Sequence, residues 1–311
     1  MKETRKIIEP ALVVGNNKLA YSLAVCLRDA GHPVILSTAN APKAWNYLRY
    51  HKNDIRKWSP GQYGPFDIKV IEDLHFENGI KLAFVITEED LIAKQEVISF
   101  LESRLPEDAV IAINSETIPL DAIQDNLAKP GRILIANWVE PVHTTFFLEI
   151  VANEVTEARF VDQITDLARS YWGKDPYVIQ GDTGVRMRLL AALMREAFYL
   201  VKNDYATIED IDRACRNDAG YYLPFAGNLR YMDLMGTYSY GMVMKDLNPE
   251  LAKDQTAPDF FNALIREGDF GMESGKGFYA YQPGEDEKWE ALVKKFSSEI
   301  HEVIDKYPFN Q

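Results

Sequence analysis

The sequence is poor in cysteine, and its basic residues are outnumbered by acidic ones. Its 311 residues include two cysteines, Cys26 and Cys215, which lie in separate segments of helical apolar spacing. Neither a disulfide framework nor a cysteine metal site fits this pattern, so we expect a reducing, cytoplasmic location. The 34 lysines and arginines are outnumbered by 47 aspartates and glutamates, which gives a net charge of -13. Because such a surface repels phosphates, we expect neither nucleic acid nor a membrane as a partner.

Long apolar runs, internal repeats and flexible linkers are also missing from the sequence. The first apolar run ends at Gly15, too soon for a signal peptide or a membrane span. Hydrophobic residues nevertheless make up 47% of the chain, which is enough to form a full core. The length predicts two domains.

Short apolar runs predict an α/β fold for the N-terminal part. Residues 11–14 predict a strand that ends in a turn at Gly15, followed by a helix that stops at Gly31 and a second strand at 34–36. Further strands are predicted at 68–71, 82–86, 110–113 and 133–136. Because these runs do not alternate with polar residues and are interleaved with helices, we expect a Rossmann-type parallel sheet that is covered on both faces.

The pattern changes after residues 177–179. From residue 185 onward the apolar residues keep helical spacing, and no strand is predicted before the end of the chain. We therefore expect a Rossmann-like domain over residues 1–183 and an all-α C-terminal domain over residues 184–311.

The turn after the first strand lies where a dinucleotide fingerprint would lie, at the start of a helix whose dipole favours a pyrophosphate. Of the three glycine positions in that fingerprint, only Gly15 is glycine, and Asn17 and Ala20 fill the others. Asparagine tolerates a left-handed backbone and alanine is small, so the fold is preserved. Both a cofactor site and a purely structural turn fit this pattern.

The second strand ends in Ser37 and Thr38 in place of the acidic residue that binds the adenosine ribose of NAD. These neutral hydroxyls, followed shortly by Lys43, permit NADP as well as NAD. The absence of any ligand at this position is equally consistent with the pattern. The basic segment that follows comprises Lys43, Arg49, His51, Lys52, Arg56 and Lys57. Such a run is usually a solvated helix face, and the alternative is a cationic strip for the phosphates of coenzyme A.

Several segments, taken in order along nearly the whole chain, resemble the 3-hydroxyacyl-CoA dehydrogenase family. They are the turn at Gly15, Asn114-Ser115-Glu116-Thr117, Asn137-Trp138-Val139-Glu140-Pro141, Leu148-Glu149-Ile150-Val151, Gly173-Lys174-Asp175-Pro176, Glu209-Asp210-Ile211-Asp212 and the segment from Gly271 to Tyr279. The segment from Gly227 through Gly236 resembles the carnitine and gulonate dehydrogenase branch more than the fatty-acid branch.

The resemblance implies a homodimer that transfers hydride between NAD(P) and a 3-hydroxy acid or its CoA ester. In the family, a histidine takes the proton of the substrate hydroxyl and a glutamate orients that histidine. Glu149 stands at the glutamate position, whereas the histidine position is Asn137. An amide has no useful basicity, and the loss of a general base typically costs roughly 10²–10⁴ in rate. The ordinary mechanism therefore cannot operate unchanged.

The resemblance also implies roles for other polar positions. Glu116 stands where the family has a serine that binds the acyl oxygen, and the family's asparagine on the first helix of the second domain falls at Met187 or Arg188. Asn114 resembles the asparagine near the nicotinamide. The candidate cofactor-binding residues are Gly15, Asn17, Ala20, Thr38, Lys94 and Asn114.

His143 is a candidate substitute base because it follows Asn137 by six residues, with Glu140 in the same loop. The pair Glu140 and His143 fits a surface contact as well. A metal site built from Glu140, His143 and Glu149 lacks a ligand-spacing signature, and we expect none. Two functions remain: an oxidoreductase with a rebuilt catalytic site, and a catalytically inactive family member that binds a ligand or serves as a scaffold.

Overall fold

The structure, a computed structural model, describes residues 9–51, 68–76 and 79–308. The chain divides into two compact units, residues 1–187 and 188–311. The division falls inside helix α6 (Arg186–Lys202), whereas the predicted boundary after residue 183 lies in the connection just before this helix.

The first unit is built on an eight-stranded sheet with the order β3-β2-β1-β4-β5-β6-β7-β8. Its strands are β1 (Ala11–Gly15), β2 (Val34–Ser37), β3 (Ile68–Ile71), β4 (Leu82–Ile86), β5 (Val110–Ile113), β6 (Ile133–Asn137), β7 (Glu149–Ala152) and β8 (Tyr177–Gln180). Strands β1 to β6 pair in parallel, as predicted. The sheet is not parallel throughout, because β7 runs antiparallel to β6 and parallel to β8.

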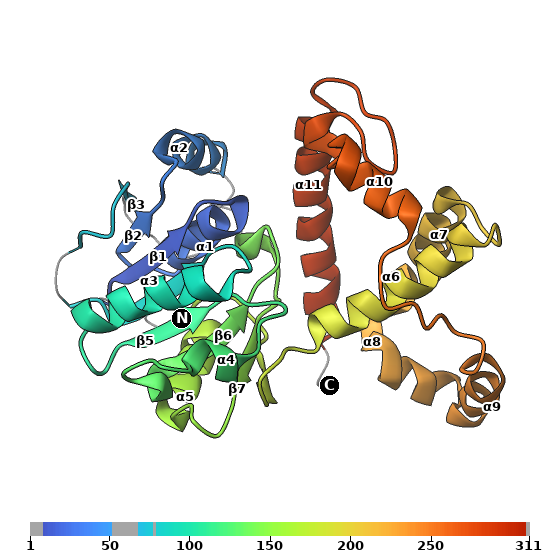
Figure 1. Cartoon of the computed structure of the whole chain (residues 1–311). Coiled ribbons are helices and arrows are strands. Elements are labelled where there is room, and N and C mark those ends of the chain that lie inside the picture. The colour runs from blue at the N-terminus through green and yellow to red at the C-terminus, as the bar shows by residue number, and fades with distance from the viewer. Residues whose placement is uncertain (1–8, 52–67, 77–78, 309–311) are drawn as a thin grey trace. The chain divides into compact units, whose positions relative to one another are not determined.

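Helices cover both faces of this sheet (Figure 1). One apolar cluster joins the sheet to α1 (Lys18–Asp29), α2 (Ala41–Tyr50) and α5 (Ala158–Ser170). A second cluster joins the opposite face to α3 (Leu91–Arg104) and α4 (Leu120–Gln124). The strands pack on both faces, which explains their continuous apolar runs and confirms the predicted Rossmann-type architecture.

The sheet topology brings polar residues to one edge. Gly15 and Asn137 end the parallel strands β1 and β6, and Asn114 follows the end of β5. Because β7 is antiparallel to β6, its first residue, Glu149, lies at this same edge, directly opposite Asn137. Ligands of open α/β sheets bind at the carboxyl ends of the strands, so this edge is the place to look for a functional site.

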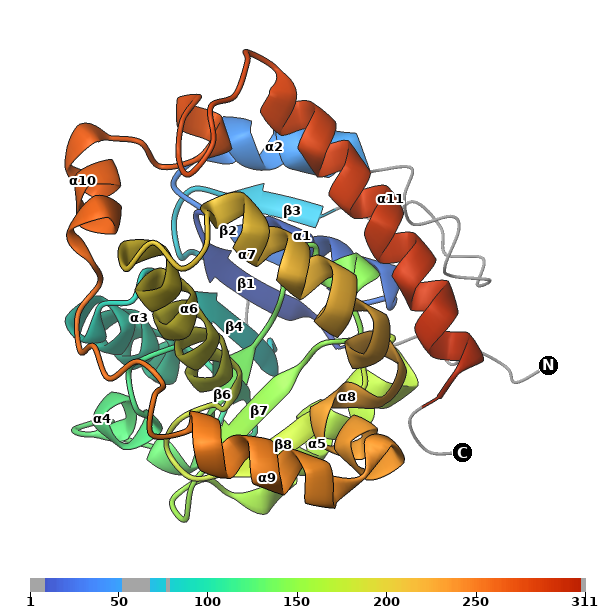
Figure 2. The ribbon, with the colours of Figure 1, turned by 90° about the vertical axis from the view of Figure 1, so that its right-hand side faces the viewer.

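The second unit is helical, as predicted. Beyond α6 it contains α7 (Ile208–Ala214), α8 (Gly220–Met235), α9 (Thr237–Leu247), α10 (Asp259–Glu267) and the long α11 (Glu285–Lys306), shown in Figure 2. Among the described residues it has no strand, only isolated bridges at Lys276. Of its residues up to 308, those that are buried are Ala226 and Ala252, so its helices leave most of their apolar side chains partly or fully exposed. Over the described residues, no helix has both the length and the apolar character needed to cross a membrane.

Candidate active site

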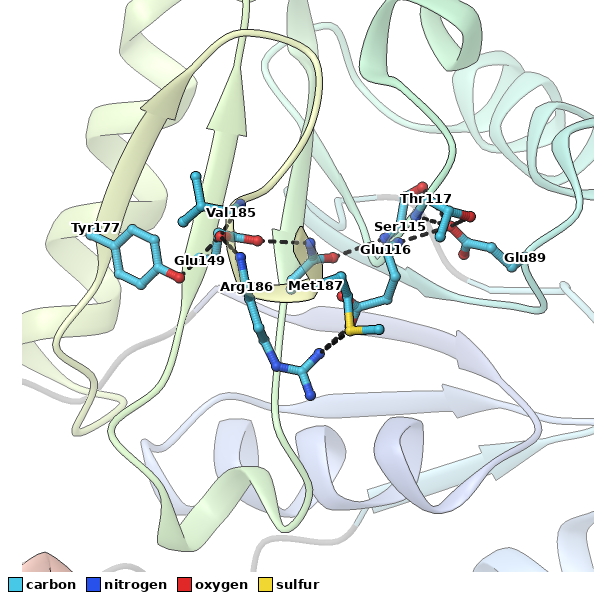
Figure 3. Close-up of polar contacts among 10 residues, drawn as sticks. Glu89, Ser115, Glu116, Thr117, Glu149, Tyr177, Val185, Arg186 and Met187 are labelled. Carbon is cyan, nitrogen blue, oxygen red and sulfur yellow. Dashed lines mark hydrogen bonds and ion pairs between the residues drawn. The ribbon is translucent and has the colours of Figure 1, made fainter. Parts of the chain in front are cut away.

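Three side chains form a row across the last three strands of the sheet. Asn137, Glu149 and Tyr177 are register partners in β6, β7 and β8. The Nδ2 group of Asn137 donates to Oε1 of Glu149 at 3.2 Å. The Tyr177 hydroxyl donates to Oε2 of Glu149 at 3.0 Å (Figure 3). Asn137 and Glu149 are buried. The pairing that the resemblance implies for Glu149 is therefore present, with an amide as its partner.

The start of α6 binds to the same carboxylate. The backbone N–H groups of Val185 and Arg186 donate to Oε2 of Glu149 at 2.8 and 3.1 Å. A Cβ atom at Gly184 would lie 2.0 Å from Oε1, so this position has room only for glycine. A carboxylate at a helix N-terminus is stabilised by the helix dipole. Glu149 therefore anchors the start of α6 as well as Asn137.

The Asn137 amide is held at both ends. Its Oδ1 atom accepts a hydrogen bond from the backbone N–H of Ser115 at 2.9 Å, while Nδ2 faces Glu149. Because the Ser115 N–H requires an acceptor and the Glu149 carboxylate requires a donor, the amide has only one favourable orientation.

Glu116 and Arg186 form an ion pair beside this row. The Nη1 group of Arg186 donates to Oε1 of Glu116 at 2.8 Å, and the guanidinium lies 5.7 Å from the ring centre of Phe147. The Oε2 atom of Glu116 is buried and has no hydrogen-bond partner among the described residues. Burial raises the pKa of the Glu116 carboxyl above its ordinary value, and the charge of Arg186 only partly offsets this.

Glu89 fixes the loop that carries Glu116. Its Oε1 atom accepts hydrogen bonds from the backbone N–H groups of Glu116, Thr117 and Ile118, at 2.8, 2.7 and 3.1 Å. Burial alone would raise the pKa of Glu89, but the N–H groups of Thr117 and Ile118, the charge of Lys94 and a bond from the Ser115 hydroxyl outweigh burial and lower this pKa. Glu89 is therefore a charged clamp on the loop after β5.

The turn after β1 is tight. A Cβ atom at Gly15 would lie 2.4 Å from the carbonyl oxygen of Ile86 and 2.7 Å from Cβ of Ala20, so Gly15 is required by packing. Asn17 caps α1, and its Oδ1 accepts from the Ala20 N–H at 2.9 Å. The backbone of Asn17 is extended, with φ of -128°, so the left-handed conformation that asparagine tolerates is not used here.

Thr38 is occupied by contacts within the chain. Its hydroxyl donates to Oδ1 of Asn16 at 3.0 Å and lies 3.3 Å from the Tyr21 hydroxyl. Asn16 also accepts from the backbone N–H of Ala39 at 2.6 Å, so this side chain joins the turn after β1 to the turn after β2. Thr38 is 2% exposed and supports these turns from within.

Lys94 also faces inward. Its Nζ group donates to the backbone carbonyls of Asn114 at 2.8 Å and Thr87 at 3.3 Å, and lies 3.4 Å from Oε2 of Glu89. The side chain is fully buried, and burial lowers its pKa. Lys94 therefore ties together the loops after β4 and β5.

Two neutral acceptors at these loops are suited to a dinucleotide. The side-chain oxygens of Thr87 and Asn114 are buried and have no hydrogen-bond partner within the described ranges. A nicotinamide carboxamide and a ribose offer N–H and O–H donors for such atoms. Together with the close-packed turn at Gly15 and the start of α1, these acceptors fit the nicotinamide dinucleotide that the resemblance implies.

His143 lies in a short 3₁₀ turn, Val142–Thr144. Its ring contacts His51 of α2 edge-on, with centroids 4.9 Å apart. This contact places His143 beside α2, and the four hydrogen bonds to Glu149 described above come from other residues. Lys43, Arg49 and His51 lie on α2 or at its end, whereas Lys52, Arg56 and Lys57 of the basic segment lie outside the described residues. Among the described side chains, no group of three His, Cys, Asp or Glu residues could hold a metal ion.

Sequence reasoning missed three residues of this site: Glu89, Tyr177 and Arg186. Arg186, which contacts Glu116, directly precedes Met187 and Arg188, the two positions that the resemblance gives to the family's asparagine. The Sδ atom of Met187 lies 3.3 Å from Nη1 of Arg186. The Thr-Glu-Glu-Asp stretch after the apolar residues of β4 was a signal for Glu89, because the residues after parallel strands gather at one edge.

Comparisons with known proteins agree with this architecture. The family model described as "3-hydroxyacyl-CoA dehydrogenase, NAD binding domain" matches residues 11–183, and that of the "C-terminal domain" matches residues 185–281. A 5-formyl-3-hydroxy-2-methylpyridine 4-carboxylate 5-dehydrogenase of Mesorhizobium japonicum is 30% identical over 209 residues, which cover 66% of this chain and 67% of that protein. The fatty acid oxidation complex subunit alpha of Vibrio parahaemolyticus is 26% identical over 87% of this chain, which spans only 38% of that protein.

Solved structures show the same fold. A crystal structure of a 5-formyl-3-hydroxy-2-methylpyridine 4-carboxylic acid 5-dehydrogenase, described as an NAD⁺-dependent dismutase, has a TM-score of 0.86 at 23% identity and covers 96% of this chain and 99% of that chain. A 3-hydroxyacyl-CoA dehydrogenase from Archaeoglobus fulgidus has a TM-score of 0.64 at 22% identity, covering 97% and 100%. With both of its domains matched in order, the chain belongs to the 3-hydroxyacyl-CoA dehydrogenase family, whose N-terminal domain binds NAD.

Proposed function

We propose that this protein is an active NAD-dependent oxidoreductase that interconverts a hydroxyl and a carbonyl group on a small acid or its CoA ester. One observation carries the proposal: the row of Asn137, Glu149 and Tyr177 lies beside the ion pair of Glu116 and Arg186, at the sheet edge that also holds Gly15. When bound, NAD supplies the acceptor or donor of hydride. The residues of the chain bind and orient the substrate and handle its proton.

Asn137 serves as a hydrogen-bond donor in this proposal. One hydrogen of its Nδ2 group points to Glu149, and no contact of the described residues uses the second. A fixed N–H group of this kind stabilises the oxygen of a carbonyl or alkoxide as charge develops on it. Glu149 holds the amide in place and does not itself exchange a proton, because four donors already surround its two oxygens.

Arg186 supports an anionic substrate. Only its Nη1 group is used by the contact with Glu116, and a guanidinium carries further N–H donors that bind a carboxylate in bidentate fashion. A 3-hydroxy acid, a 3-hydroxyacyl-CoA and the pyridine carboxylate named for the Mesorhizobium relative are therefore the substrates to test first.

NAD is the cofactor that we propose over NADP. The Thr38 hydroxyl, which was expected to permit a 2′-phosphate, is buried in contacts with Asn16 and Tyr21. A fluorescence titration of the purified chain with NADH and with NADPH tests this choice. Binding of NADH at micromolar concentration with weaker binding of NADPH supports it. No binding of either at millimolar concentration would refute the dehydrogenase function.

A second candidate function is favoured by Asn137 itself. Because an amide cannot act as a base, a catalytically inactive member that binds a dinucleotide or an acyl ligand also fits the site. The two are separated by turnover: NADH binding without reduction or oxidation of 3-hydroxybutyrate, 3-hydroxybutyryl-CoA or the pyridine carboxylate pair would favour the binding protein.

We also propose that the protein is a homodimer formed by its second unit. Apolar side chains of this unit are exposed, with Leu229 of α8 at 76% and Phe296 of α11 at 63%. Contiguous exposed apolar faces mark interaction surfaces, and a symmetric second copy is the commonest partner.

A further inference from the structure

Glu116 differs from every other carboxylate of the site in one respect. Its Oε1 atom is held by Arg186, while its Oε2 atom is buried without a partner among the described residues. We propose that Glu116 is the proton-transfer residue of this protein, which takes the proton of the substrate hydroxyl in place of the missing histidine. This inference rests on the proposed function and assigns the one role in it that Asn137 cannot fill.

The step balances as an ordinary alcohol oxidation. The O–H bond of the substrate hydroxyl breaks, and its proton passes to Oε2 of Glu116. On the carbon that carries this hydroxyl, the C–H bond breaks, and the hydrogen leaves with the electron pair as hydride to NAD⁺. A carbonyl double bond forms, so the substrate is oxidised by two electrons. In the reverse direction protonated Glu116 returns the proton to the oxygen.

The position of Glu116 is fixed from two sides. Its backbone N–H is bound by Glu89, and its side chain is bound by Arg186, which is itself anchored through its backbone N–H to Glu149 (Figure 3). A general base must be held within reach of its proton, and these bonds remove the rotations that would move the carboxylate away. The adjacent Ser115 N–H also joins this loop to Asn137.

The charged groups around Glu116 act in opposite directions. Arg186 favours the carboxylate form, whereas Glu149 and Glu89 oppose it, and burial opposes it most. Lys94 lies behind the loop. Burial lowers the pKa of Lys94, and the charge of Glu116 opposes this shift only in part. A carboxyl whose pKa is shifted toward the working pH is better suited to exchange protons in both directions.

Other residues of the site are less suited to this role. The carboxylate of Glu149 is saturated by four donors, and the hydroxyl of Tyr177 donates to it. Burial and the nearby Glu149 charge raise the pKa of Tyr177, which opposes its use as a base. The ring of His143 packs against His51.

The first test is Glu116→Gln, since the Gln side chain can still accept from Arg186 but cannot take a proton. We expect unchanged NADH affinity and unchanged unfolding temperature, with kcat lower by roughly 10²–10⁴. Glu96→Gln makes the same chemical change on an exposed position of α3 and should leave kcat unchanged. If Glu116→Gln retains wild-type kcat, the ion pair of Glu116 and Arg186 only holds the start of α6 in place, and the proposal is overturned.

The second test reads the carboxyl without catalysis. In the full chain labelled with ¹³C at glutamate carboxyls, one resonance should titrate above the ordinary glutamate range and disappear in Glu116→Gln. Arg186→Met removes the cation that stabilises the carboxylate, so the same resonance should titrate at a still higher pH. The acidic limb of kcat for alcohol oxidation should move by the same amount. The proposal is contradicted if the titration of this resonance is the same in Arg186→Met as in the wild type. It is also contradicted if the acidic limb of the kcat profile does not shift with the resonance.

Failure of this inference is distinct from failure of the proposed function. If the wild-type chain binds no NADH, the proposed function fails and the role of Glu116 fails with it. If the wild-type chain binds NADH and turns over one of the three probe substrates, but Glu116→Gln does so equally fast, only the assignment of Glu116 is wrong.

Discussion

Asn137 and Glu149 face each other across the antiparallel pair β6 and β7, with Nδ2 and Oε1 3.2 Å apart. The amide between Ser115 N–H and Glu149 can only donate toward the carboxylate. The Asn137 side chain therefore transmits the position of Glu149 to the loop after β5. It does so without a titratable group at position 137.

The first prediction concerns the direction of the hydrogen bond from Asn137 to Glu149. Glu149→Gln places an NH₂ group against another donor whichever way the amides turn, so we expect a loss of about 1–3 kcal/mol in the free energy of unfolding. The double variant Asn137→Asp with Glu149→Gln restores one donor and one acceptor at the contact. Urea unfolding should show that most of the lost stability returns in the double variant. Additive losses would contradict the assigned hydrogen bonds.

The second prediction concerns Gly184. Because a Cβ atom there would lie 2.0 Å from Oε1 of Glu149, Gly184→Ala must displace the carboxylate or the start of α6. We expect a loss of about 1–3 kcal/mol in unfolding free energy. The matched control is Gly241→Ala in α9, where nothing lies within 4 Å of the added atom and alanine favours the helix. Equal stability of the two variants would contradict the close packing at Gly184.

The third prediction is a pH dependence. The pKa of Glu89 is lowered on folding, so the unfolded chain binds more protons between the two pKa values and stability rises with pH there. The stability that Glu89 contributes is complete above the ordinary glutamate pKa. It is lost as the pH falls through the pKa that Glu89 has in the folded chain. Glu89→Gln should therefore cost about 1–3 kcal/mol at neutral pH and progressively less in acid. A pH-independent difference in urea unfolding would contradict this reasoning.

The fourth prediction concerns assembly. If the exposed faces of the second unit pair with a second copy, sedimentation should give a dimer, and Leu229→Asp on α8 should shift it toward monomer. Ile92→Asp is the control, because Ile92 is 68% exposed on α3 of the first unit and should not affect the dimer. A wild-type monomer at micromolar concentration would rule out the proposed homodimer.

Local patterns predicted the architecture well. Each predicted element depends on a short continuous stretch of sequence. This holds for the apolar runs of β1 to β6, the turn at Gly15 and the helical spacing beyond residue 185, and the structure contains these strands and helices. The antiparallel β7 was not predicted as part of the sheet, since its four residues resemble any short buried strand and their direction is set by pairing with β6.

The polar contacts of the site were harder to predict. Arg186 lies 70 positions beyond Glu116, and Glu89 lies 27 positions before it, so no local spacing signals either contact. The same holds for Tyr177, which meets Glu149 only because β8 pairs with β7. The resemblance indicated Glu116 and Asn137 as departures from the family pattern, but the pairing of Glu116 with Arg186 is visible only in the fold.

The most direct test of a functional nucleotide site at this sheet edge is diffraction from crystals of the protein soaked with NADH. We expect density for the dinucleotide along the start of α1, with the nicotinamide end within hydrogen-bond distance of Asn114 Oδ1 and close to Glu116. Absence of density at millimolar NADH, or density away from Gly15 and Asn114, would contradict this expectation.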